Sequence, residues 1–228
     1  MAIDEQMLAN LTRGCVDLLP EGLLEKRLET AGKEGRRLRV KLGVDPTAPD
    51  IHLGHTVVLS KLRQFQDAGH KAALIIGDYT ARIGDPSGVS KTRPQLLSDE
   101  IEANAKTYQE QAWKVLDRDP EKLELRRNSE WLAHMNLEDI FRLLSASTVA
   151  RILERDDFAK RFAGNQAISM LETLYPLLQG YDSVAIDADI ELGGTDQKFN
   201  MLMGRVVQEY YGKEPQVVLT TEILPGTD

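Results

Sequence analysis

The chain has 228 residues, of which 42% are hydrophobic and 28% charged, a composition typical of a globular protein rather than a disordered one. Its formal net charge of −8 argues against a surface that grips nucleic acid non-specifically, because such binding needs clustered lysine and arginine. We therefore expect no DNA partner, while local contact with RNA stays open. No apolar run approaches the roughly 20 residues of a membrane span, the first residues lack the pattern of a secretory signal, and the single cysteine cannot form an internal disulfide. We expect a cytoplasmic protein that binds no membrane.

The first third of the chain predicts two short helices and then a strand–helix–strand unit. The two amphipathic helices are expected at residues 2–13 and 20–31, with Gly14 and Gly32 as their stops. The unit that follows consists of a strand at 38–44, a helix at 53–68 and a strand at 71–76. Its strands should be parallel and buried, with a right-handed crossover between them.

The rest of the chain separates this unit from a second α/β half. Residues 95–180 are nearly all helical in pattern, and they are followed by a predicted strand at 183–190, a helix at 196–211 and a strand at 216–221. We see no internal repeat or long linker. The sequence therefore predicts a single α/β domain over residues 1–228, with a Rossmann-like nucleotide-binding fold, a parallel sheet and a helical connective insertion at about 95–180.

The stretch from Asp45 to His55 lies where such a fold places its ligand, past the carboxyl end of a strand and at the start of a helix. Free backbone N–H groups and the helix dipole make that position a phosphate site. His52 and His55 share a helix face and can donate hydrogen bonds to phosphate oxygens, and Thr47 adds a hydroxyl donor. Gly54 lets a flat ring or a phosphate approach the backbone. The alternative is that both histidines merely cap the helix; with 4 histidines in the chain, we expect no metal site.

Two further segments suggest a pocket. The glycine-rich loop at 77–88 follows the second strand and should lie at the same sheet edge as the histidines. Tyr175, Gln179 and Asp182 are spaced i, i+4 and i+7, which places them on one helix face. Three polar side chains on one helix face indicate the wall of a pocket. The alternative is an ordinary helix face exposed to solvent.

The turn at 193–197 is expected between a strand and a helix, again at the carboxyl edge. Its glycines allow close approach of a ribose or adenine, and Asp196 can accept hydrogen bonds from ribose hydroxyls. Lys91 and Arg93 are candidates for contact with pyrophosphate, with ordinary surface charge as the equal alternative.

The segment from Asp45 to His55 resembles the His-Ile-Gly-His signature of class I aminoacyl-tRNA synthetases, and residues 43–47 and 84–88 resemble the tyrosyl-tRNA synthetases in particular. The resemblance implies a ligase that activates L-tyrosine with ATP, with Mg2+ accompanying the nucleotide as co-substrate, and then transfers tyrosine to tRNA(Tyr). It implies no tightly bound cofactor and no covalent enzyme intermediate. It also implies a homodimer whose surface includes helices of 95–180.

The resemblance also implies roles for individual residues. The catalytic residues would be Thr47, His52 and His55. The tyrosine-binding residues would be Asp45, Thr80, Asp85, Tyr175, Gln179, Asp182 and Gln197. The ATP-binding residues would be Gly43, Pro46, His52, Gly54, His55, Gly194 and Asp196. Within the tyrosine set, Tyr175 and Gln179 resemble contacts to the amino group and Asp182 the acceptor for the phenol hydroxyl. Gln197 resembles the contact to the substrate carboxyl group, and a carboxylate such as Asp85 can hold the ammonium group.

The match departs from the family at several places. Lys41 and Leu42 stand where many bacterial members have Tyr and Cys, and Lys198-Phe199 replaces a frequent Trp-Gly, which suggests a second bacterial subtype. The chain stops just before the expected Lys-Met-Ser-Lys-Ser-like loop, and the anticodon and RNA-binding regions are absent from it. We expect residues 1–228 alone to be a poor catalyst.

Three rival interpretations remain. A tryptophanyl-tRNA synthetase shares the fold but has no need for an acceptor facing a phenol. A small-molecule adenylyltransferase with His-x-Gly-His would not need the face formed by residues 175–182. A tyrosine-binding regulatory module would be a synthetase-like chain without the catalytic loop.

Overall fold

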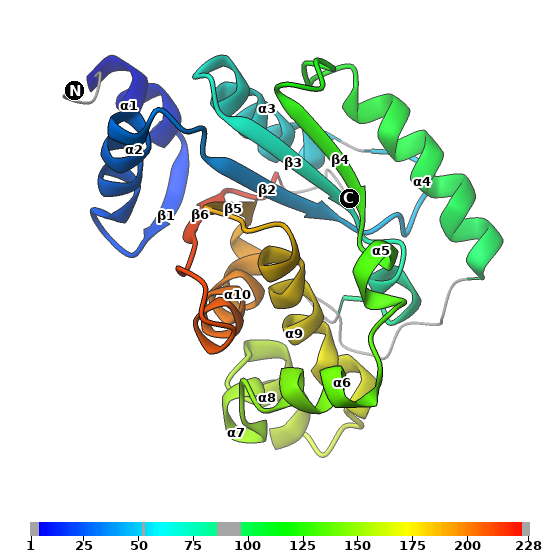
Figure 1. Ribbon diagram of the computed structural model, residues 1–228. Helices are drawn as coiled ribbons and strands as arrows, with labels where there is room; N and C mark the ends of the chain where they lie inside the picture. Colours follow the sequence, from blue (N-terminus) through cyan, green and yellow to red (C-terminus); the bar gives the residue numbers. More distant parts are fainter. Residues whose placement is uncertain (1–4, 52, 86–96, 225–228) are drawn as a thin grey trace.

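The computed structural model describes residues 5–51, 53–85 and 97–224. Across these residues, strands form one sheet in the order β1-β6-β5-β2-β3-β4 (Figure 1). The strands are β1 Cys15–Leu19, β2 Arg39–Val44, β3 Lys71–Ile76, β4 Leu123–Arg127, β5 Ile190–Gly194 and β6 Val217–Thr221. All neighbouring pairs are parallel except β1 and β6, which are antiparallel. The predicted α/β, Rossmann-like fold with a parallel sheet is confirmed.

Helices cover both faces of this sheet (Figure 1). The helical segments are α1 Glu5–Thr12, α2 Leu23–Glu34, α3 Leu53–Asp67, η1 Thr80–Arg82, α4 Ser98–Ala112, α5 Ser129–Leu132, α6 Leu137–Leu144, α7 Val149–Ile152, α8 Asp156–Ala163, α9 Met170–Ala185, η2 Thr195–Gln197 and α10 Lys198–Tyr210. Within the ranges described, no helix combines the length and apolar character needed to cross a membrane.

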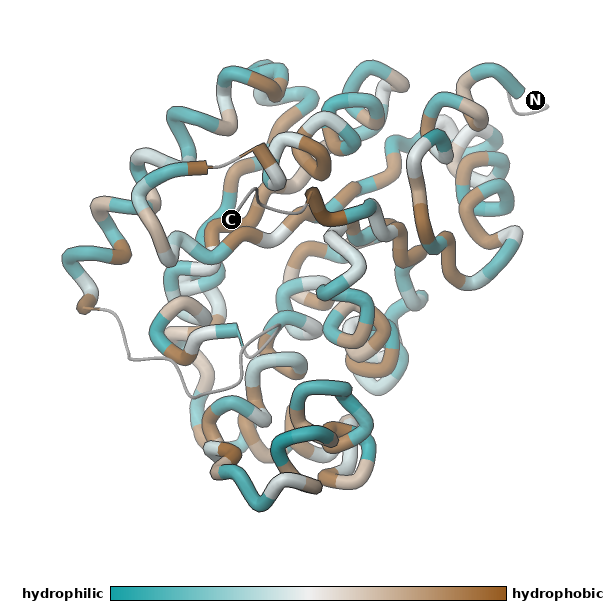
Figure 2. The backbone as a smooth tube through the Cα atoms, turned by 180° about the vertical axis from the view of Figure 1, so that it is seen from behind, coloured by the Kyte–Doolittle hydropathy of each residue, from teal (hydrophilic) through white to brown (hydrophobic). Residues whose placement is uncertain are grey.

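Burial on both faces explains why the central strands are apolar throughout. On β3, Ala72 and Leu74 belong to the core shared with α2 and α3, whereas Ala73 and Ile75 pack against residues that follow α9. Successive strand residues point to opposite faces, so a strand covered on both sides carries apolar residues at every position. Figure 2 shows hydrophobic stretches of the chain running along these central strands.

Both edge strands differ from the expectation. Residues 15–19 had no predicted strand, but they form β1, which pairs with β6 alone. Residues 123–127 lie in the stretch predicted as nearly all helical, but they form β4, with Leu123 and Leu125 paired along β3. The sequence Leu-Glu-Leu-Arg-Arg alternates apolar and charged residues, which is the period of a half-buried strand at a sheet edge. The helical expectation for 95–180 was wrong over these five residues.

The predicted strand at 183–190 was also wrong in most of its length. Ser183 to Ala185 complete α9, Asp187 takes a left-handed conformation with φ of 49°, and β5 begins only at Ile190. The apolar residues in this stretch are buried by a helix end and a turn, which periodicity alone does not distinguish from a strand. Likewise, α2 runs through Gly32 and ends at Gly35, whose φ of 65° suits a glycine stop.

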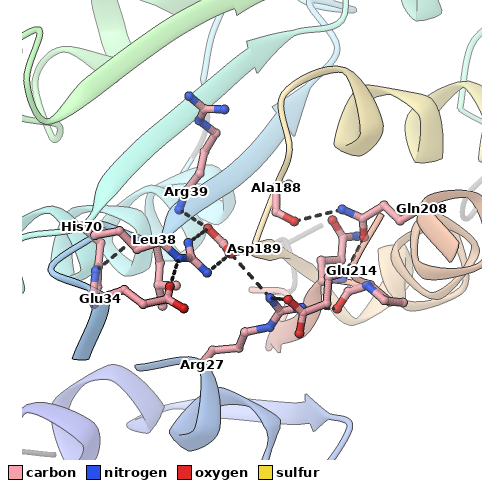
Figure 3. A network of polar contacts seen from close by, with 12 residues as sticks. Arg27, Glu34, Leu38, Arg39, His70, Ala188, Asp189, Gln208 and Glu214 are labelled. Atoms are coloured by element: carbon pink, nitrogen blue, oxygen red, sulfur yellow. Dashed lines mark hydrogen bonds and ion pairs between the residues drawn. The ribbon is translucent and has the colours of Figure 1, made fainter. Parts of the chain in front are cut away.

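Asp189 ties the amino ends of β2 and β5 together (Figure 3). Its carboxylate accepts two hydrogen bonds from the Arg36 guanidinium, at 2.9 and 3.0 Å, and one from the Arg39 backbone N–H at 2.8 Å. Arg27 on α2 lies 3.7 Å from the same carboxylate. This buried acid therefore has cationic and backbone partners from three segments, and it anchors the amino-terminal helices to the sheet.

Candidate active site

A cavity of about 410 Å3 opens at the carboxyl ends of β2 and β5. The chain continues from β2 to β3 on one side, and β5 lies on the other side of β2, so the cavity lies at the point where the strand order reverses. Open parallel sheets bind their ligands at such switch points. The fold therefore places the candidate site where the sequence located it.

Most of the predicted site residues line this one cavity. They are Gly43, Asp45, Thr47, Gly54, His55, Thr80, Asp85, Tyr175, Gln179, Asp182, Gly194, Asp196 and Gln197. Pro46 is not among the lining residues: it is buried, and its carbonyl accepts a hydrogen bond from Asn104 on α4 at 3.1 Å. His52, Lys91 and Arg93 lie outside the described residues.

Asp45, directly after β2, is held by two hydroxyl groups. Thr80 Oγ1 donates to one carboxylate oxygen and the Tyr175 hydroxyl to the other, both at 2.8 Å. Burial raises the pKa of Asp45 to about 7, against the lowering effect of these two hydrogen bonds, and the negative charges of Asp85 and Asp182 raise it further. The Asp45 carboxylate therefore has hydroxyl partners but no cation beside it to balance its charge.

Asp182, on the same face of α9 as Tyr175 and Gln179, forms a second acidic point of the cavity. Its carboxylate accepts from Trp131 Nε1 at 2.8 Å and from Asn128 Nδ2 at 3.3 Å. Burial raises its pKa to about 6, opposed chiefly by the positive charge of Lys41. All three residues of the predicted pocket wall line the cavity.

Behind this wall, Lys41 and Glu191 form an ion pair that is shielded from solvent. Lys41 Nζ lies 2.8 Å from Glu191 Oε1, and the two side chains are 0% and 1% exposed. Gln179 Nε2 donates to the same oxygen of Glu191 at 3.1 Å, and Gln216 donates to the other. The pair therefore joins β2, β5 and α9 next to the cavity.

Asp85 lines the cavity and belongs to a hydrogen-bond network that reaches the helical insertion. It accepts from Gln197 Nε2 at 2.7 Å and from Arg155 at 3.2 Å, while Asn200 Nδ2 donates to Gln197 Oε1 at 3.0 Å. Arg155, at the start of α8, also donates to Asn200 at 2.9 Å. The side chains of Asp85 and Gln197 are thereby oriented together by a buried arginine.

The glycines of the cavity serve two different purposes. A Cβ built at Gly43 would meet no atom within 4 Å, so this backbone borders open space. At Gly194 a Cβ would lie 2.5 Å from Asp196 Oδ1, and at Gly193 it would lie 2.9 Å from Met201 Sδ. The turn at 193–197 was predicted to leave room for a ligand, whereas here protein atoms fill the space beside these two glycines. Of the three glycines compared, Gly43 is the one beside open space.

His55 lies in the first turn of α3 and lines the cavity. Its ring meets the ring of Tyr108 on α4 edge to face, with 5.9 Å between the centroids. An imidazole at a helix start is suited to hydrogen bonding with a phosphate. Across the described part of the chain, no group of three or more His, Cys, Asp or Glu side chains is arranged to hold a metal ion.

Several residues of the site were not predicted. Asn128 and Trp131 hold Asp182, Arg155 and Asn200 hold Asp85 and Gln197, and Glu191 pairs with Lys41. Asn128 directly follows β4, so recognition of that strand would have placed Asn128 at the carboxyl edge with the other site residues. Nothing in the local sequence distinguishes Arg155 or Glu191 from ordinary surface charges, because their partners are distant along the chain.

Comparison with known proteins gives concordant matches. The family model described as "tRNA synthetases class I (W and Y)" matches residues 33–228. The chain is 58% identical to a tyrosine–tRNA ligase of Carboxydothermus hydrogenoformans, covering 100% of this chain and 56% of the relative. It is 59% identical to that of Thermotoga maritima, covering 98% and 54%. The chain thus spans about half the length of these relatives.

A solved structure supports the fold. The chain superimposes on a C-terminally truncated mitochondrial tyrosyl-tRNA synthetase of Aspergillus nidulans with a TM-score of 0.81, at 23% sequence identity. The match covers 98% of this chain and 69% of that one.

Proposed function

The chain belongs to the class I tRNA synthetases of the tryptophan and tyrosine type, and we propose that the protein carrying it activates L-tyrosine with ATP and transfers the amino acid to tRNA(Tyr). The observation that carries the choice of tyrosine is Asp182, whose carboxylate is directed by Trp131 and Asn128 at a cavity wall. A phenol hydroxyl donates to such an acceptor. Phenylalanine cannot, so its binding would cover the Asp182 carboxylate without giving it a hydrogen bond from the substrate.

The other end of the amino acid meets an excess of negative charge. Asp85 and Asp182 both act on Asp45 with their negative charge, and the hydrogen bonds to the Asp45 carboxylate come from neutral hydroxyls. An ammonium group supplies the missing positive charge. The Tyr175 hydroxyl donates a hydrogen bond to Asp45. The hydroxyl oxygen of Tyr175 keeps lone pairs that can accept a hydrogen bond from the same ammonium group. Gln197, held by Asp85, then faces the substrate carboxylate.

ATP occupies the cavity between His55 and the open backbone of Gly43. A carboxylate oxygen of tyrosine attacks the α-phosphorus, a P–O bond to that oxygen forms, and the bond to pyrophosphate breaks. No side chain has to accept a proton, because the nucleophile is already ionised. The protein contributes orientation and hydrogen bonds to the phosphate oxygens, from His52, His55 and Thr47, with Mg2+ bound to the nucleotide as part of the substrate.

A homodimer is part of the same proposal. Large apolar side chains are exposed on α6, α7 and α8, the helices farthest from the sheet in Figure 1, and at the start of α9. They are Leu137, Phe141 and Leu144 on α6, Val149 on α7, Phe162 on α8, and Met170 and Leu171 on α9. Exposed apolar residues on neighbouring elements are typical of interaction surfaces. Sedimentation of the full-length protein at dimer mass, and of Phe141→Asp at monomer mass, would support a second copy as the partner.

The test of the activity is ATP–pyrophosphate exchange by the full-length protein with tyrosine, tryptophan and phenylalanine. Tyrosine is expected to exceed phenylalanine in kcat/KM by at least about 10^4-fold, as in sites built around a substrate hydroxyl. A faster reaction with tryptophan would identify the other member of the family. Tight tyrosine binding without exchange would support the regulatory module instead.

A further inference from the structure

Lys41 is a long, fully buried side chain in the middle of the central strand β2. Its ammonium group contacts three oxygen atoms, each at 2.8 Å: the carbonyl of Gln179, the hydroxyl of Ser183 and Oε1 of Glu191. A lysine ammonium has three protons to donate. These three acceptors match them, so Lys41 does not serve as a direct donor to a substrate.

The three contacts act on the pocket wall. Gln179 and Ser183 are four residues apart on α9, and Asp182 lies in the turn between them. The side chain of Gln179 also bonds to Glu191, the partner of Lys41. One buried ion pair therefore holds the turn that carries the phenol acceptor, by its backbone and by a side chain.

The Lys41–Glu191 ion pair also acts electrostatically on Asp182. Lys41 faces it from β2, Glu191 from β5, Asp45 from the loop after β2 and Tyr175 from α9, while Trp131 and Asn128 supply neutral hydrogen bonds. Lys41 lowers the pKa of Asp182 more than Glu191 raises it. A carboxylate is a stronger acceptor for a phenol than a neutral carboxyl group.

We propose that Lys41 is a positioning residue for substrate selection, which fixes the α9 turn and maintains Asp182 as an ionised acceptor for the tyrosine hydroxyl. The inference rests on the proposed function, since it concerns how the tyrosine pocket discriminates.

The experiment compares kcat/KM for tyrosine and phenylalanine in ATP–pyrophosphate exchange by the full-length protein, from about pH 5.5 to about pH 8.5. Both substrates carry the same ammonium group, so titration of Asp45 cancels in their ratio. The test variant is Lys41→Met/Glu191→Gln, which removes both charges without leaving one buried alone. Its tyrosine preference at neutral pH is expected to fall about 10-fold or more, and the midpoint of its pH dependence to rise by about 1 unit.

The matched control is Lys61→Met. Lys61 is also buried, at 4% exposure, but its ammonium group binds the carbonyls of Asn10, Leu11 and Arg13 at the end of α1, away from the cavity. This variant should lose thermal stability and keep the tyrosine preference unchanged.

A lowered melting temperature with an unchanged preference in the double variant would show a purely structural role and overturn the proposal. Should the double variant not fold, Ser183→Ala removes a single contact of Lys41, and its preference should fall about 3-fold; no fall there overturns the proposal as well. If the wild-type protein shows no preference for tyrosine, the proposed function itself fails, which is a separate result.

Discussion

The neighbouring strands β2 and β5 have an aspartate at each end of the pair, the buried Asp189 before β5 and the half-buried Asp45 after β2, and the two carboxylates have different partners. At the amino end, Asp189 is surrounded by Arg36, Arg27 and a backbone N–H. At the carboxyl end, Asp45 is held by the hydroxyls of Thr80 and Tyr175. One acid has its charge balanced inside the protein, and the other does not.

The two aspartates differ in role: Asp189 stabilises the fold, and Asp45 favours the binding of a ligand. A buried charge needs a partner of opposite sign, and supplying that partner from the chain stabilises the fold. Where hydroxyls stand in place of a cation, the pKa of the acid rises, to about 7 for Asp45, and the fold is left with a preference for a positively charged ligand. Asp45, at the carboxyl end, therefore destabilises the unliganded protein, and binding of an ammonium group offsets this cost.

The sharpest test of this contrast is Asp45→Asn. Loss of the charge should lower kcat/KM for tyrosine by about 100-fold or more, because a charged pair with the substrate is removed. Stability should not fall. The folded-state pKa of about 7 lies above the ordinary value of 3.8, so the stability that this group contributes is complete below about pH 3.8 and is lost as pH rises through about 7. ATP–pyrophosphate exchange kinetics measure kcat/KM, and a thermal melt at alkaline pH measures stability. A large loss of stability in Asp45→Asn would contradict the contrast drawn between Asp45 and Asp189.

The converse substitution, Asp189→Asn, should act on stability. It removes the carboxylate that Arg36 and Arg27 share, although these arginines keep Glu34 and Glu214 as partners. We expect the free energy of unfolding to fall by about 2–3 kcal/mol, below the range for fully buried pairs because Arg36 is 38% exposed. Urea denaturation gives this value. The kcat/KM of the folded enzyme should stay within about 3-fold of wild type. If Asp189→Asn lost tyrosine activation without losing stability, the amino and carboxyl ends of the β2–β5 pair would be coupled.

A smaller effect is expected from filling the open space at the carboxyl end. Gly43→Val adds a side chain where no atom lies within 4 Å, so the fold should accept it while the cavity loses volume. We expect KM for ATP to rise about 10-fold, which corresponds to about 1.4 kcal/mol. Gly32→Ala on α2 is the matched control, since a Cβ there also meets nothing within 4 Å and lies outside the cavity. Equal KM values for the two variants would exclude a nucleotide beside Gly43.

The smallest effect concerns His70 beside the amino-end network. Its Nδ1 accepts from the Leu38 backbone N–H at 3.4 Å. Burial lowers the pKa of His70, against the raising effect of Asp189 and with a smaller lowering effect of Arg36. The folded state thus disfavours the charged ring, so stability is complete above the unfolded pKa of about 6.5 and declines as pH falls below it. In His70→Gln this part of the acid sensitivity should disappear. The exposed His134→Gln should retain it, and urea midpoints at several pH values compare the two.

Much of the fold could be predicted from local patterns. The run at 71–76 matched β3 residue for residue, and the helix at 53–68 matched α3 to within one residue, because strong periodicity and a glycine stop define them. The edge strands β1 and β4 were missed because each is half-buried and acquires its strand conformation from one neighbouring strand. The segment at 183–190 was misassigned because a buried helix end and a buried strand look alike in sequence.

The site shows the same division. The spacing of Tyr175, Gln179 and Asp182 and the position of His55 at a helix start are local properties of the chain, so the sequence could point to them. The tyrosine-binding roles of Asp45, Thr80, Asp85 and Gln197 came from the resemblance to the tyrosyl-tRNA synthetases. Tertiary structure alone decided which side chains hold them: Asn128 and Trp131 on Asp182, Arg155 on Asp85, and Lys41 with Glu191 behind the wall. These partners lie tens of residues or more away along the chain. Charge balance between buried groups depends on distance in space, and only the folded sheet brings Asp45 and Asp189 to opposite ends of the same pair of strands.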